Sequence, residues 1–102
     1  MYYTYILRCE DGSLYTGITT DVKRRFNEHC TDETKGAKYT ARHKPVKIEA
    51  VWSSGTRALA SKLEYRIKQL TKKEKEEIIK SSNLEILKEK IDVSEYEWEN
   101  VK

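Results

Sequence analysis

The pattern of hydrophobic and polar positions near the start of the chain, an apolar run followed by a polar turn, predicts a β-hairpin. Residues 2–8 (YYTYILR) are dense in aromatic and β-branched side chains, which favour a pleated, half-buried surface. An Asp-Gly dipeptide follows, and it favours a tight turn because glycine tolerates positive φ. We therefore predict antiparallel strands over 2–8 and 14–19. This pairing places Tyr5 and Tyr15 on neighbouring strands, near each other if the register puts them on one face.

Two later segments carry apolar residues at helical spacing. Val22 and Phe26 lie four residues apart and share a face, which predicts a helix over 21–30 with Thr20 as its N-cap. The longest helix is predicted over 56–70, where the apolar positions form one stripe at about 100° per residue. Those positions are Leu59, Ala60, Leu63, Ile67 and Leu70.

Between and after these helices the pattern changes again. An alternating run over 46–52 predicts a third strand, and the polar stretch 31–44 predicts a loop. A capping-box pattern at 71–74 predicts the start of a further helix. The same pattern at 82–85 predicts a short helix that ends at Ile91.

The acidic tail from Asp92 onward carries two aromatic residues, Tyr96 and Trp98. Two interpretations stay open for this segment. It either docks on the fold through its aromatic rings or stays mobile. As an interaction segment it would use Trp98 as the anchor for a protein partner.

Together these elements predict the α/β (α+β) class, with a three-stranded, mostly antiparallel sheet flanked by helices. The chain has 102 residues, of which 37% are hydrophobic and 36% charged, so we expect one small core. We divide it into a folded domain over 1–80 and a helical, acidic C-terminal extension over 81–102.

Composition excludes several classes of protein. No stretch approaches the ~20 apolar residues that a membrane-spanning helix needs. The N-terminus lacks the basic start and long apolar run of a secretory signal. The two cysteines, Cys9 and Cys30, form no zinc-binding pattern and are expected to be reduced thiols. We therefore expect a cytoplasmic protein that is not embedded in a membrane.

Charge is distributed unevenly along the chain. Residues 1–75 carry 16 basic and 9 acidic residues, a balance of +7, whereas 76–102 carry 4 and 8, a balance of −4. Five basic residues and no acid lie between Lys35 and Ile48: Lys35, Lys38, Arg42, Lys44 and Lys47. Such a basic field favours a polyanion such as nucleic acid, although a solvated loop has the same composition.

Five residues have side chains that suit phosphodiester cleavage: Tyr5, Tyr15, Arg25, His29 and Glu64. Arg25 offers a planar donor that suits phosphate, and His29 lies one helical turn away from it. Glu64, on the shoulder of the apolar stripe, offers a hard oxygen ligand for Mg²⁺. Each also has a structural interpretation: cross-strand packing for the tyrosines, a helix-edge pair for Arg25 and His29, and a solvated position for Glu64.

The same residues resemble the GIY-YIG nuclease domain. The segment Tyr15–His29 is similar to the second half of that motif with its following helix, and Tyr3-Thr4-Tyr5 occupies the first half. The chain looks most like small standalone members of the family, which add a loop similar to 36–40 and a helix end similar to 64–72. This sequence has Tyr-Thr-Tyr for Gly-Ile-Tyr, and Thr16 for Ile.

The resemblance implies a metal-dependent endonuclease that hydrolyses DNA phosphodiester bonds, a reaction that fits DNA repair or recombination. By position, Tyr15 looks like the general base and Tyr5 like the residue that supports it. Arg25 looks like the phosphate ligand, His29 like an assisting residue, and Glu64 like the sole protein ligand of one Mg²⁺ or Mn²⁺ ion.

Four further residues are expected to contact or border the substrate: Gly17, Lys38, Tyr39 and Arg42. Gly17 would let the backbone turn tightly beside the site. The substrate is expected to be DNA, with branched and single-stranded forms as candidates, held mainly through its backbone. The alternative is a nucleic-acid-binding module with little or no catalysis.

Overall fold

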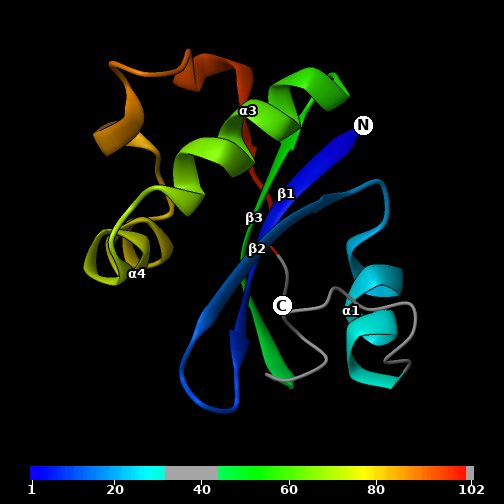
Figure 1. The fold of residues 1–102 in the computed structure, drawn as a ribbon. Coiled ribbons are helices and arrows are strands. Elements are labelled where there is room, and N and C mark those ends of the chain that lie inside the picture. The colour runs from blue at the N-terminus through cyan, green and yellow to red at the C-terminus, as the bar shows by residue number, and fades with distance from the viewer. Residues whose placement is uncertain (32–43, 101–102) are drawn as a thin grey trace.

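The computed structural model describes residues 1–31 and 44–100, and within them four strands form one antiparallel sheet (Figure 1). The strands are β1 (Tyr2–Cys9), β2 (Leu14–Thr19), β3 (Pro45–Ser54) and β4 (Glu97–Trp98), in the order β2-β1-β3-β4. The α+β class and the three predicted strands are confirmed. The two-residue β4 was not predicted: it pairs with β3 through Trp52 and Ser53.

The register of the β1–β2 hairpin places both tyrosines on one face. Tyr5 lies opposite Gly17, and Leu7 lies opposite Tyr15. Side chains alternate across a strand, so Tyr5 and Leu7 share a face, and Tyr15 is a diagonal neighbour of Tyr5. The turn closes with Gly12 at φ 86°, the left-handed region that favours glycine.

In the described part of the chain, three α-helices flank the sheet: α1 (Val22–Thr31), α3 (Arg57–Lys68) and α4 (Lys72–Ser81). Their bounds follow the predictions closely. One cap differs, because the side chain of Asp21, and not of Thr20, accepts a hydrogen bond from the backbone of Arg24 at 3.1 Å. Asp21 accepts this bond at the N-terminus of α1, the end at which a negative charge is also favourable.

The two faces of the sheet carry separate apolar clusters. Figure 1 shows α1 set apart from α3 and α4. On one face the buried residues are Ile6, Ala50, Trp52, Leu63, Ile67, Ile78, Leu84, Leu87 and Ile91. On the other face Tyr5, Leu7 and Val51 pack with Tyr3, Tyr15, Val22, Phe26 and Ile48. The candidate tyrosines therefore lie on the face that α1 covers.

The C-terminal segment differs from the predicted short helix. It forms two 3₁₀ turns, η1 (Glu85–Leu87) and η2 (Val93–Glu95), before β4. The hydroxyl of Tyr96 donates to the carbonyl of Leu59 at 2.6 Å, and Trp98 packs edge-on against Trp52 with ring centroids 5.4 Å apart. Of the two interpretations of this tail, docking through its aromatic rings is the one that the structure bears out.

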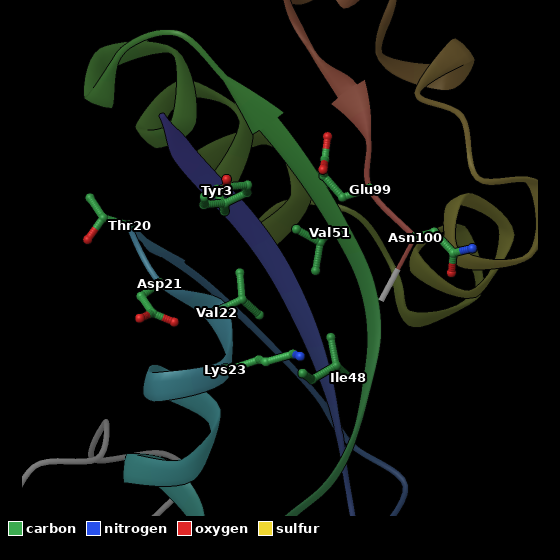
Figure 2. A pocket seen from close by; sticks show the side chains of 9 residues that line it. All are labelled: Tyr3, Thr20, Asp21, Val22, Lys23, Ile48, Val51, Glu99 and Asn100. Atoms are coloured by element: carbon green, nitrogen blue, oxygen red, sulfur yellow. The ribbon is translucent and has the colours of Figure 1, made fainter. Parts of the chain in front are cut away.

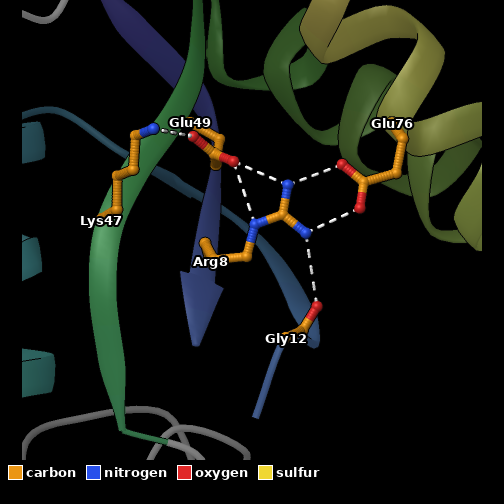
Figure 3. A network of polar contacts seen from close by, with 5 residues as sticks. All are labelled: Arg8, Gly12, Lys47, Glu49 and Glu76. Atoms are coloured by element: carbon orange, nitrogen blue, oxygen red, sulfur yellow. Dashed lines mark hydrogen bonds and ion pairs between the residues drawn. The ribbon is translucent and has the colours of Figure 1, made fainter. Parts of the chain in front are cut away.

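A network of charges ties α4 to the sheet at the far end of β1 (Figure 3). Arg8 donates to Glu76 at 2.6 Å through both terminal nitrogens, and to Glu49 at 2.7 and 3.0 Å. Burial alone raises the pKa of Glu49, but hydrogen bonds from Arg8 and Lys47 hold that pKa below its usual range. Within the described residues, no helix is both long and apolar enough to cross a membrane.

Candidate active site

Two phenol rings and one imidazole meet between β1, β2 and α1. The Tyr5 hydroxyl lies 3.1 Å from Nε2 of His29, within hydrogen-bond distance. The ring centroids of Tyr15 and His29 are 5.2 Å apart at 63°, and those of Tyr5 and Tyr15 are 6.3 Å apart. His29 is 4% exposed and Tyr5 2%, so this contact is almost closed to solvent. Tyr15 is only partly buried.

Gly17 makes room for the two phenols. A Cβ atom built on it would lie 2.5 Å from the Tyr5 hydroxyl oxygen and 3.1 Å from a ring carbon of Tyr15. The first distance is shorter than real Cβ contacts and the second is tighter than most of them, so a side chain here would displace the Tyr5 ring and press on that of Tyr15. The predicted role of Gly17 was tight backbone geometry beside the site. Gly17 lies within strand β2 and has no positive φ, so the predicted tight turn is wrong, and the close approach of the phenols is the reason for glycine here.

Arg25 lies one turn before His29 on α1 and is close enough to act on both phenols. Its positive charge lowers the pKa of Tyr5 and Tyr15 against the larger effect of burial. Nη1 of Arg25 donates to Glu28 at 3.1 Å. Burial alone would lower the pKa of Arg25, but Glu28 and the two phenols raise it by more than burial lowers it. The pKa therefore lies above its ordinary value, and the guanidinium stays charged.

Glu64 reaches the same neighbourhood from α3, which packs against β1 and β2. Its negative charge raises the pKa of both Tyr5 and Tyr15, an effect that requires proximity. Its side chain is 24% exposed and pairs with Nζ of Lys68 at 3.4 Å. The five candidate side chains thus converge from two strands and two helices.

Burial sets the protonation of the aromatic groups. It raises the pKa of Tyr5 and of Tyr15 above the ordinary value of 10.0. Burial, together with the charge of Arg25, lowers the pKa of His29 from 6.5 to about 4. At pH 7 both phenols therefore carry their protons and His29 is neutral. A phenol here can lose its proton only with further positive charge nearby.

The chemistry of the donors limits what metal the site can take. Among residues 1–31 and 44–100, no group of three or more His, Cys, Asp or Glu side chains is placed to hold a metal ion. Among the carboxylates of the described residues, Glu64 is the one whose charge acts on both Tyr5 and Tyr15. A single, partly exposed carboxylate fits an ion such as Mg²⁺, which keeps several water ligands, and does not fit a closed zinc site.

Three predicted substrate residues lie outside the described part of the chain: Lys38, Tyr39 and Arg42. Their roles stay predictions. Glu28 was missed from the sequence, although its spacing of three residues from Arg25 on a predicted helix is the pattern of an ion pair.

A cavity of about 330 Å³ lies beside the N-terminus of α1, and Figure 2 shows side chains from α1, the sheet and the C-terminal segment around it. Its lining residues are Tyr3, Thr20, Asp21, Val22, Lys23, Ile48, Val51, Glu99 and Asn100. None of the five candidate residues lines it. The cavity is therefore distinct from the convergent side chains.

Comparison with known proteins identifies a family and several relatives. A family model described as "GIY-YIG catalytic domain" matches residues 1–77. The UPF0213 protein FN1575 of Fusobacterium nucleatum is 54% identical over 78 residues, which cover 76% of each chain. The UPF0213 protein BH0048 of Halalkalibacterium halodurans is 44% identical over 78 residues, 76% of this chain and 81% of that protein.

A solved structure is also similar. The solution NMR structure of the UPF0213 protein BH0048 from Bacillus halodurans aligns with a TM-score of 0.50 at 43% sequence identity. The alignment covers 78% of this chain and 84% of that one. This solved relative therefore shares the fold, and 43% of the sequence, over 78% of this chain.

Proposed function

Because the chain belongs to the GIY-YIG catalytic-domain family, we propose that it is an endonuclease that hydrolyses DNA phosphodiester bonds. The observation that supports this most is the contact between the Tyr5 hydroxyl and Nε2 of His29 at 3.1 Å, with Tyr15 beside it. Arg25 and Glu64 act electrostatically on the same two phenols. Cross-strand packing alone does not require a guanidinium and a carboxylate at this point.

Arg25 would bind the scissile phosphate. Its guanidinium presents several donors in one plane, and it stays charged at any physiological pH. Glu28 holds one of these donors at 3.1 Å, which fixes the guanidinium near the phenols before substrate arrives. A positive charge already in position stabilises the additional negative charge of the transition state without reorganisation.

Tyr15 would act as the general base and Tyr5 as its support. Tyr15 is the more exposed of the two phenols and can meet a water molecule, whereas Tyr5 is 2% exposed and already engaged with His29. His29 is neutral at pH 7, so it can hold the Tyr5 hydroxyl without adding charge to the site. The Tyr5–His29 pair would thus position Tyr15 and its water.

Glu64 would hold one Mg²⁺ or Mn²⁺ ion, whose charge would stabilise the phosphate and acidify a nearby water. The same charge would counter the effect of Glu64 on the phenols, which raises their pKa. Lys38, Tyr39 and Arg42 would contact the DNA backbone. Branched and single-stranded DNA are the proposed substrates, and repair or recombination in the cytoplasm is the proposed setting.

One observation favours a second candidate function, a nucleic-acid-binding module with little catalysis. Burial holds the pKa values of Tyr5, Tyr15 and His29 away from neutrality. Without a metal ion, none of these three groups would exchange a proton readily at pH 7. In that function the protein would bind DNA through its basic segments, and binding would weaken as salt rises.

Cleavage of labelled branched, single-stranded and duplex DNA would separate the two functions. The purified protein is incubated with Mg²⁺, Mn²⁺ or EDTA, beside Glu64→Gln and Tyr15→Phe variants. Endonuclease function predicts metal-dependent cleavage by the wild type and a loss of at least about 100-fold in each variant. Equal cleavage by all three proteins would identify a contaminant and refute the proposal. Tight DNA binding without turnover under every condition would favour the binding module.

A further inference from the structure

The charged residues of the candidate site are each held in a pair within their own helix. Arg25 pairs with Glu28 on α1 at 3.1 Å, and Lys68 pairs with Glu64 on α3 at 3.4 Å. The two pairs differ in exposure. The side chains of Arg25 and Glu28 are 26% and 30% exposed, whereas Lys68 is 53% exposed over a Glu64 that is 24% exposed. The more exposed Lys68 can therefore separate from Glu64 with little loss of folding free energy.

We propose that Lys68 is the exchangeable counter-ion of Glu64. In the metal-free protein its ammonium neutralises the carboxylate. When a divalent cation occupies Glu64, the ammonium moves to a phosphate of the bound DNA backbone. This inference rests on the proposed function, because it needs a metal ion at Glu64.

Electrostatics supports the exchange. An ammonium and a divalent cation repel each other, so they cannot share one carboxylate closely. An exposed pair of this kind contributes little to stability, so its loss is easily compensated. Lys68 is also the last residue of α3, and its flexible four-carbon side chain extends from the C-terminal end of that helix. A strongly hydrated point charge on a flexible stem suits contact with a moving phosphate.

The metal arm of the test uses Mn²⁺ alone as the probe. Free aqueous Mn²⁺ is followed by electron paramagnetic resonance during titration of the full chain. Lys68→Met keeps the length of the side chain and removes its charge, so we expect Mn²⁺ to bind roughly two- to fivefold more tightly. Lys88→Met is the matched control, since Lys88 forms a similar helical pair with Glu85 at 3.3 Å. We expect no change in that variant.

The DNA arm measures binding of a fluorescent branched oligonucleotide at several salt concentrations, in a Tyr15→Phe background to limit cleavage. With Mn²⁺, Lys68→Met should reduce the slope of log K against log salt by about one, the signature of one lost phosphate contact. In EDTA the same substitution should leave the slope unchanged, because Lys68 is then held by Glu64.

The outcomes separate this inference from the proposed function. If Glu64→Gln binds Mn²⁺ as tightly as the wild type does, the metal is not at Glu64, and both this inference and the proposed metal-binding role of Glu64 fail, whereas the cleavage assay decides the endonuclease function separately. If Glu64→Gln loses Mn²⁺ but Lys68→Met behaves like Lys88→Met, only the counter-ion role of Lys68 is overturned. A change of slope in EDTA equal to that in Mn²⁺ also overturns it, because Lys68 would then contact DNA without any exchange.

Discussion

Gly17 lies directly against Tyr5, and a Cβ atom on Gly17 would be 2.5 Å from the Tyr5 hydroxyl oxygen. This contact joins the two strands that carry the candidate tyrosines. It also makes the hydroxyl position depend on the absence of a side chain on the neighbouring strand. The glycine in the second half of the sequence motif is therefore explained by packing, because Gly17 lies in a strand and has no positive φ.

Gly17→Ala tests this relationship. The added methyl group should displace the Tyr5 hydroxyl and lower the free energy of unfolding by about 1–3 kcal/mol, as overpacking does. Cleavage activity per folded molecule should fall about 10- to 100-fold, because the reacting groups lose their alignment. Urea unfolding and a cleavage assay measure the two effects. Gly55→Ala is the control, since a Cβ at Gly55 would meet nothing within 4 Å. Wild-type activity in Gly17→Ala would contradict the steric role.

His29 should make stability depend on pH. Its pKa falls from 6.5 to about 4 on folding, so the unfolded chain binds its proton more readily. The free energy of unfolding therefore does not depend on His29 above pH 6.5. It decreases as the pH falls from 6.5 toward 4, by about 3 kcal/mol in all, because protonation of His29 then favours the unfolded chain. His29→Gln retains a hydrogen-bonding group and does not titrate. Urea unfolding from pH 4 to 7.5 should show a steeper loss for the wild type than for this variant, and parallel curves would refute the prediction.

The Arg8 network should stabilise the fold without affecting chemistry. Arg8→Met leaves Glu49, whose side chain is 10% exposed, without its main partner. We expect a loss of about 2 kcal/mol, because a largely buried carboxylate loses its hydrogen bonds. Lys47→Met removes a 68%-exposed partner of the same carboxylate and should cost less than about 0.5 kcal/mol. Thermal unfolding of Arg8→Met and Lys47→Met measures both changes in stability. Equal losses of stability in the two variants would contradict the role of Arg8 as the main partner of Glu49.

Trp98 should stabilise the fold through its contact with Trp52. Trp98→Ala removes this edge-on aromatic pair and loosens the β4 strand, with an expected loss of about 2 kcal/mol for a partly buried ring. Ile86→Ala, at a position 50% exposed, is the control and should cost less than about 0.5 kcal/mol. Tryptophan fluorescence during urea unfolding measures the stability of both variants. An unchanged midpoint in Trp98→Ala would show that the tail contributes little.

The local parts of the fold could be predicted from the sequence, because local chemistry determines them. A run of aromatic and β-branched residues and an Asp-Gly turn predict the β1–β2 hairpin, and helical periodicity predicts the face of α3 that is buried. The capping box that begins α4 is present as predicted, with Thr71 and Glu74 bonded to each other's backbone. These patterns depend on neighbours within a few residues.

The C-terminal segment shows where local pattern is insufficient. The second capping-box pattern predicted a helix to Ile91, yet only the 3₁₀ turn η1 forms there. Leu84, Leu87 and Ile91 instead fill the main core, and burial of these side chains outweighs a weak helical preference. The pairing of β4 with β3 depends on contacts between Trp52 and Trp98, which no local pattern encodes.

The sequence by itself determined which residue types are available for chemistry and on which elements they lie. Only the tertiary structure decided that the Tyr5 hydroxyl meets His29, that Gly17 gives the phenols room, and that Glu64 acts on both rings from another helix. The reason is physical: spacing fixes the face of one helix or strand, whereas contacts between elements depend on how strand register and side-chain packing bring those faces together.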